Sequence, residues 1–190
     1  MNSDYLAIAQ VRGGACPGAN QMKTTNKLVC CMMIAGFAVM IPTKANAQSD
    51  DDKKFVATAA QSDVNEIALS EVAKDKATNP AVKAFAEKMI TEHKKMTASM
   101  KPFAEKWGMN PPVGPDADHK KELDTLNGKS GADFDKEYMD QMVSDHSKAL
   151  DAFTSEAKDT KDLKFRAAVL KGKTAVAAHK NMAYDLKKKL

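Results

Sequence analysis

Beyond the acidic residues 50–52, apolar residues recur every three or four positions, which is the spacing of one face of an α-helix. The first such face comprises Val56, Ala60, Val64, Ile67 or Ala68, and Val72. A helix start at Asn79-Pro80 precedes the second face, which comprises Val82, Phe85, Met89, His93, Met96, Met100, Phe103 and Trp107. Gly108 then ends the segment. The pattern predicts two long amphipathic helices.

A break rich in proline and glycine separates these helices from the second half of the chain. Residues 110–115 predict a linker, and a short helix is predicted from about Asp116 to Leu126, ending at Asn127-Gly128. The third long apolar face comprises Phe134, Tyr138, Met142, His146, Ala149 or Leu150, Phe153 and Ala157. After a turn at residues 159–162, the fourth comprises Phe165, Val169, Gly172, Val176, His179, Ala183 and Leu186.

Four long amphipathic helices can each bury one face against the others. They predict an all-α fold, an antiparallel four-helix bundle with a short extra helix in the connection between the second and third long helices. No alternating pattern typical of strands competes with this prediction. The length of 190 residues and the low aromatic content of 6% fit one helical domain.

The segment before the helices is typical of a secretory signal peptide. In residues 22–47, Lys23 and Lys27 precede an apolar run over residues 28–41, and Ala45-Asn46-Ala47 provides a cleavage site. The apolar run would span about 21 Å as a helix, against about 30 Å of membrane hydrocarbon. We therefore expect cleavage after Ala47 and a periplasmic protein; an uncleaved signal tethered in the inner membrane is the alternative.

The remaining boundaries follow from this leader. Residues 1–21 are expected to be an N-terminal extension without function, residues 48–54 a polar lead, and residues 55–190 the bundle domain. All three cysteines lie before residue 48, so the exported part has neither a disulfide framework nor a thiolate metal site.

The charge of the exported part is balanced. The whole chain has 29 Lys and Arg against 25 Asp and Glu, and residues 1–47 hold four of these basic residues and one acidic residue. The remainder, 25 against 24, gives no electrostatic basis for binding nucleic acid or an anionic membrane.

Three of the four histidines fall on apolar faces of different long helices: His93, His146 and His179. An inward-facing imidazole needs a partner for its ring nitrogens, such as a carboxylate, a hydroxyl, water or a metal ion. The three could converge on one metal ion, or each could pair separately with a polar neighbour, and the sequence leaves both possibilities open. His119 begins the short helix beside acidic residues and is expected near the surface.

The residues around these histidines restrict the metal. A di-iron centre in a helical bundle needs Glu-x-x-His pairs, but Ile90, Val143 and Val176 occupy the positions three before each histidine. Methionines on the same faces, together with imidazoles, favour copper, although methionine also fills helical cores. The predicted metal site comprises His93, His146 and His179, aided by Met89, Met142 or Glu66, with copper or zinc as the ion.

No motif of a familiar enzyme class is present. The sequence has no glycine-rich phosphate loop and no Gly-x-Ser-x-Gly elbow, and the exported part has no cysteine nucleophile. Asp135, near the start of its helix, is expected to cap that helix or hydrogen bond there. Two functions remain: a non-enzymatic periplasmic protein that binds a transition metal ion, or a structural or stress-related envelope protein that contacts a protein partner and merely packs its histidines. A third, an oxidoreductase, lacks the carboxylate pairs.

Several motifs together resemble a known family. Phe134-Asp135-Lys136-Glu137-Tyr138-Met139, followed by Asp145-His146, is similar to a pattern in bacterial secreted proteins grouped as domain of unknown function 4142 (DUF4142). Asn79-Pro80, Glu92-His93, Asp118-His119 and His179 fit the same family over about residues 55–186. Its usual Leu-Pro pair is missing, because Lys171-Gly172 follows Leu170. The resemblance implies export, a ferritin-like bundle and the description of many members as membrane proteins, but no reaction.

Overall fold

The computed structural model describes residues 49–190, so the predicted leader and N-terminal extension lie outside the described residues. In this range it has five helices and no strand: α1 Asp50–Lys76, α2 Pro80–Lys106, α3 Ala117–Asn127, α4 Gly131–Asp159 and α5 Leu163–Lys187. The predicted all-α class is confirmed. None of the helices in this range is both long enough and apolar enough to cross a membrane.

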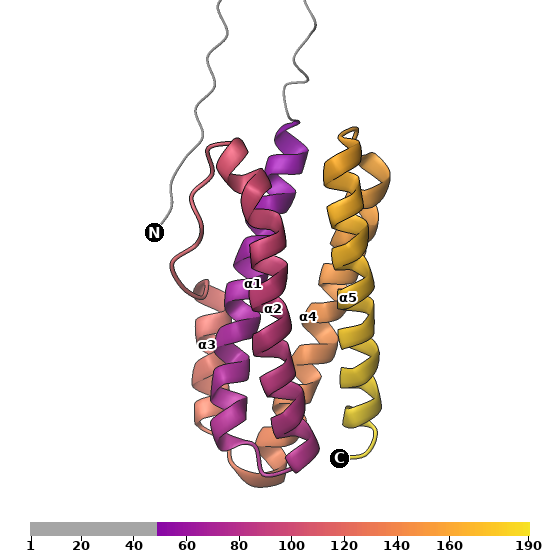
Figure 1. Cartoon of the computed structure of the whole chain (residues 1–190). Coiled ribbons are helices and arrows are strands. Elements are labelled where there is room, and N and C mark those ends of the chain that lie inside the picture. The colour runs from indigo at the N-terminus through magenta and orange to yellow at the C-terminus, as the bar shows by residue number, and fades with distance from the viewer. Residues whose placement is uncertain (1–48) are drawn as a thin grey trace, which may run out of the picture. The chain divides into compact units, whose positions relative to one another are not determined.

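The four long helices pack along their lengths, and successive helices run in opposite directions (Figure 1). Both α1 and α5 contact α2 and α4, so the four long helices enclose a common interior. The short helix α3 lies in the connection between the second and third long helices, as predicted, and contacts α1 and α4.

Local side-chain chemistry defines the helix ends. The side chains of Ser49, Asn79, Asp116 and Asp162 accept hydrogen bonds from backbone N–H groups in the first turns of α1, α2, α3 and α5. Gly108, after α2, has a φ of 69°, a left-handed conformation that glycine adopts without strain. The predicted starts of α2, α3 and α5 and the end of α2 are therefore confirmed within one or two residues. The first helix differs, because α1 begins at Asp50, inside the predicted polar lead of residues 48–54.

The buried interior contains two apolar clusters. We call the first the Tyr138 cluster; its buried members are Leu69, Ala73, Ala77, Val82, Phe85, Ala86, Met89, Leu126, Phe134, Tyr138, Met139, Met142 and Ala183. The second, the Phe165 cluster, comprises Phe55, Val56, Ala59, Met100, Phe153, Phe165, Val169 and Val176. Along α4, members of the first cluster precede His146 and Phe153 of the second follows it. The buried histidines thus form a polar layer between two apolar regions.

The predicted apolar face of the first helix is wrong in register. Of its predicted positions only Val56 is buried, and Val72 packs partly buried against the Tyr138 cluster. The other buried apolar contacts of α1 with the core come from Phe55, Ala59, Leu69 and Ala73. Helix α1 also carries five buried polar residues: Asp52, Asp63, Asn65, Glu66 and Ser70. Because the middle of α1 faces the polar layer, a search for apolar periodicity alone selects the wrong side of this helix.

The predicted faces of the other three long helices are confirmed where they approach the polar layer. Met89 and His93 on α2, Met142 and His146 on α4, and His179 on α5 are all buried. Toward the C-terminal end of α2, Met96, Phe103 and Trp107 are only partly buried against the Phe165 cluster.

Candidate metal centre

The structure brings together the three histidines that the sequence places on separate helices. Their ring centroids form a nearly equilateral triangle, with separations of 5.4 Å for His93 and His146, 5.2 Å for His93 and His179, and 5.3 Å for His146 and His179. One ring nitrogen from each lies within 4.8 Å of the others, and all three side chains are buried. Of the two arrangements that the sequence leaves open, convergence is the one observed.

Hydrogen bonds fix the orientation of two of the rings. His93 Nδ1 donates to Asp63 Oδ1 at 2.8 Å, and the other oxygen of this carboxylate accepts from the hydroxyl of Thr97 at 2.9 Å. His146 Nδ1 donates to the backbone carbonyl of Met142 at 2.8 Å. Since both acceptors require a proton on Nδ1, the neutral form of each ring has its lone pair on Nε2.

His179 is held in the opposite sense. Its Nε2 donates to Glu92 Oε2 at 2.5 Å, which leaves the lone pair of the neutral ring on Nδ1. This buried nitrogen has no hydrogen-bond partner among residues 49–190. Glu92 also forms an ion pair with Lys88, and 30% of its side chain is exposed, so it connects the buried ring to the surface.

The distances suit an ion bound to ring nitrogens. The Nε2 atoms of His93 and His146 are 3.3 Å apart. Bonds of about 2.1 Å at tetrahedral angles would place neighbouring nitrogens about 3.4 Å apart and neighbouring ring centres about 5.2 Å apart. Two lone pairs at this distance repel each other unless a proton or a cation lies between them. His93 and His146 therefore have the spacing and the tautomers that a shared metal ion requires, and His179 brings one ring nitrogen within 4.8 Å of theirs.

Burial keeps two of these rings in the form that can bind a metal. Burial, together with the neighbouring His93 and His179, lowers the pKa of His146 to about 3. Burial also lowers the pKa of His179. Because a ligating imidazole must be neutral, neither ring has to lose a proton near neutral pH.

Met89 and Met142, the predicted sulfur ligands, are fully buried members of the Tyr138 cluster. The backbone carbonyl of Met142 orients His146, which is a contribution that the sequence pattern does not predict. A role for either thioether as a metal ligand stays a prediction.

Glu66, the predicted carboxylate ligand, is buried on α1 beside His146. Its Oε1 lies 3.9 Å from His146 Nδ1, the nitrogen that already donates to a carbonyl, and its Oε2 has no hydrogen-bond partner in the described part of the chain. Burial, followed by the charges of Asp145 and Asp63, raises the pKa of Glu66 well above its ordinary value. Glu66 thus approaches the side of His146 opposite the free lone pair, and its role as a ligand stays a prediction.

Two carboxylates that orient the histidines are not part of the predicted site. Adjacent helical positions point about 100° apart, so Glu92 does not share an ion with His93; instead this divergence directs it to His179. Asp63 has a signal in the sequence, because Asp63, Glu66 and Ser70 recur at helical spacing on α1.

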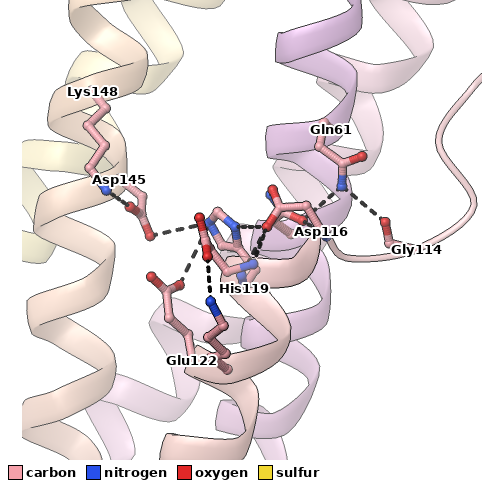
Figure 2. Close-up of polar contacts among 10 residues, drawn as sticks. Gln61, Gly114, Asp116, His119, Glu122, Asp145 and Lys148 are labelled. Carbon is pink, nitrogen blue, oxygen red and sulfur yellow. Dashed lines mark hydrogen bonds and ion pairs between the residues drawn. The ribbon is translucent and has the colours of Figure 1, made fainter.

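His119 lies near the surface, as expected, but it is partly buried: 20% of its side chain is exposed. Its Nδ1 donates to Asp116 Oδ1 at 2.9 Å, and its Nε2 lies 3.8 Å from Asp145 Oδ2 on α4 (Figure 2). The side chain of His119 on α3 therefore faces α4. Its sequence position at a helix start gives no indication of this partner on α4.

In its described residues, the chain is thus an all-α protein with a buried cluster of three histidines. The chain belongs to the DUF4142 family, described as a domain of unknown function, whose model matches residues 39–186. The resemblance seen in the sequence motifs is confirmed.

Solved structures of other proteins share the fold. A DUF305 fragment from Deinococcus radiodurans is 11% identical, with a TM-score of 0.66 over 75% of this chain and 99% of the fragment. CopM in its Cu(II)-bound form is 21% identical, with a TM-score of 0.62 over 73% of this chain and 96% of CopM. A silver-bound form of CopM, obtained by soaking, is 21% identical, with a TM-score of 0.61 over 75% of this chain and 97% of CopM. No curated protein matches the chain.

Proposed function

We propose that this is an exported, non-enzymatic protein that binds copper through His93, His146 and His179 inside a ferritin-like antiparallel four-helix bundle, with zinc as the alternative ion. The observation that carries the proposal is the state of the ring nitrogens. In each histidine one nitrogen is held by a carboxylate or carbonyl, and one nitrogen of each ring lies within 4.8 Å of the others. This pairing of ligands with hydrogen-bond acceptors behind them is typical of histidine metal sites.

The choice of copper rests on ligand chemistry. Imidazole suits both copper and zinc, and the donor nitrogens lie in a buried layer between two apolar clusters. Met89 and Met142 belong to one of these clusters, and a thioether ligand would favour Cu(I). CopM, a protein of similar fold, is known in Cu(I)-bound, Cu(II)-bound and silver-bound forms. In CopM, therefore, a similar fold binds copper and silver ions.

Export is the second part of the proposal. It rests on the basic residues, apolar run and Ala-x-Ala site in residues 22–47. Mass spectrometry of protein recovered from the periplasm should find Gln48, or its pyroglutamate form, at the N-terminus. A protein that remains in the membrane with residues 28–41 attached would contradict cleavage and favour an inner-membrane tether.

Thermal unfolding tests the metal site. A metal that binds only the native state stabilises it by RT ln(1 + [L]/Kd), which is about 2.7 kcal/mol when the free metal is a hundred times Kd. We expect Cu(I) to raise the melting temperature above its value in chelator. The increase should disappear when His93, His146 and His179 are all replaced by alanine, and also in His146→Phe, which keeps an aromatic ring of similar size.

The fourth histidine provides the matched control, because His119→Ala removes an imidazole outside the cluster. This variant should keep the full response to Cu(I). If no ion among Cu(I), Cu(II) and Zn(II) changes the melting temperature, or if His146→Phe responds as the parent does, the shared site is wrong. An envelope protein with packed histidines that acts through a protein partner would then be the better explanation.

A further inference from the structure

A second group of metal-ligating side chains lies where α3 packs against α4 (Figure 2). His119 and Glu122 come from α3, and Asp145 comes from α4. One ligand atom from each lies within 4.8 Å of the others. His119 Nε2 is 3.7 Å from Glu122 Oε2 and 3.8 Å from Asp145 Oδ2. This group shares no residue with the three-histidine cluster.

Asp116 orients the imidazole of this group. Its Oδ1 accepts from His119 Nδ1 at 2.9 Å, and from the backbone N–H groups of residues 118 and 119 at the start of α3. Its Oδ2 accepts from the side-chain amide of Asn65 at 2.8 Å, which ties the carboxylate to α1. The proton of a neutral His119 ring is thereby placed on Nδ1, and the lone pair on Nε2 faces the two other carboxylates.

The carboxylate oxygens that face this lone pair are themselves unsatisfied. Asp145 is only 8% exposed, and its Oδ1 accepts from Lys148 at 2.9 Å. Asp145 Oδ2 and Glu122 Oε2 are buried atoms without a hydrogen-bond partner within the described residues. Their distances from His119 Nε2 are too long for hydrogen bonds but close to the spacing of about 3.4 Å between tetrahedral metal ligands.

We propose that His119, Glu122 and Asp145 form a second metal site, which takes a divalent cation of the harder kind, such as Mn(II), through one nitrogen and two carboxylate oxygens. Carboxylate oxygens suit Mn(II), whereas the soft Cu(I) ion prefers nitrogen and sulfur ligands. The two sites of this chain therefore differ in the class of ion they select.

Access and charge both support this site. A surface groove of about 460 Å³ borders it, with Asp116, His119, Asp145 and Lys148 among its lining residues. The negative charges of Glu122 and Asp145 also repel each other, because each carboxylate places a buried oxygen without a described hydrogen-bond partner near His119 Nε2. A bound cation would relieve this repulsion, and the groove would admit it without opening the apolar core.

Electron paramagnetic resonance with Mn(II) as the probe tests the proposal, because the signal of the free aqueous ion decreases when the ion binds. Purified protein freed of metal should bind one Mn(II) per chain. His119→Ala and Asp145→Asn should each weaken this binding at least about tenfold, as loss of a metal-site group does. Circular dichroism should show unchanged helix content in both variants.

Two matched controls separate the proposed site from general attraction to acidic residues and from the three-histidine cluster. Asp118→Asn removes one negative charge from the same helix at a side chain that is 83% exposed, and it should bind Mn(II) like the parent. His146→Phe, which disrupts the proposed copper site, should also leave Mn(II) binding unchanged. The second site is wrong if the parent does not bind Mn(II), if Asp145→Asn binds as the parent does, or if Asp118→Asn weakens binding equally. None of these results depends on whether copper binds at the histidine cluster.

Discussion

His93 and His146 face each other through their Nε2 atoms at 3.3 Å, while the Nδ1 atom of each ring donates to a fixed acceptor. For His93 this acceptor is Asp63, a buried carboxylate on α1 that also accepts from Thr97 on α2. The carboxylate thus determines both the tautomer and the direction of the ring. A helix that contributes no histidine to the cluster therefore controls one of its ligands.

The first prediction concerns this carboxylate. Asp63→Asn keeps the size of the side chain but removes the charge that supports the proton on His93 Nδ1. We expect copper affinity to fall about 10- to 100-fold, the usual effect of losing such a partner behind a ligand. Competition against a chelator of known affinity measures it. Asp75→Asn, at an exposed position on the same helix, should change affinity little; equal losses in both variants would contradict the orienting role.

Asp135 provides the second prediction. This buried carboxylate accepts from Thr78 N at 3.0 Å, Thr78 Oγ1 at 2.7 Å and Asn79 N at 2.8 Å. It therefore fixes the turn between α1 and α2, rather than the start of its own helix as the sequence suggests. Asp135→Ala should lower the free energy of unfolding by about 2 to 4 kcal/mol, because three donors lose a charged acceptor that is itself buried. Urea unfolding measures this loss, and Asp133→Ala, which is exposed, should stay near the parent.

The comparison of α1 with α4 shows how far apolar periodicity predicts the fold. On α4, Tyr138, Met142 and His146 repeat at intervals of four, so the buried face is visible in the sequence. On α1, the middle of the buried face is Asp63 and Glu66, and apolar residues beside it give a competing pattern. Hydropathy identifies a helix face when its contacts are apolar, but not when the contact is a polar layer shared with other helices.

The candidate site was predictable to a similar extent. Placing His93, His146 and His179 on three apolar faces predicts that they point inward, and an up-and-down arrangement can bring such positions to one level. The pairing of Glu92 with His179 depends on the rotation of α2 relative to α5, which one sequence does not specify. The contact of His119 with Asp145 depends on how α3 packs, and α3 has too little apolar surface to reveal its orientation.

The third prediction concerns Tyr138, which is fully buried and shares a hydrogen bond of 2.9 Å with the Ser70 hydroxyl. Tyr138→Phe keeps the ring but leaves a buried hydroxyl on α1 without this partner. The free energy of unfolding should fall by about 1 to 3 kcal/mol. In Ser70→Ala/Tyr138→Phe the combined loss should be smaller than the sum of the two single losses. Strictly additive losses in denaturant unfolding would mean that the two hydroxyl groups do not interact.

The last prediction concerns two neighbouring carboxyl groups, Asp52 on α1 and Glu156 on α4. Each is three residues from a member of the Phe165 cluster. Both side chains are buried. Burial, a hydrogen bond with Asp52 and the charge of Asp52 raise the pKa of Glu156 to about 8. The native protein thus holds a proton on Glu156 that the unfolded chain releases above its ordinary pKa of about 4.5. Between these two values the native state binds more protons than the unfolded state, so stability must fall as pH rises.

Measurements between about pH 6.5 and 8 separate this effect from that of His146, because His146 contributes in the opposite direction and only at lower pH. The native pKa of His146 is about 3, below its ordinary value of 6.5, so this residue lowers the stability only as the pH falls below 6.5. Above pH 6.5, the free energy of unfolding from urea titrations should decrease with pH by at most about 1.4 kcal/mol per pH unit for one proton. Glu156→Gln imitates the protonated group and should flatten this slope, whereas Glu87→Gln, at an exposed position, should retain it. A parent protein whose stability stays level or rises across this range would show that Glu156 is already ionised in the native state.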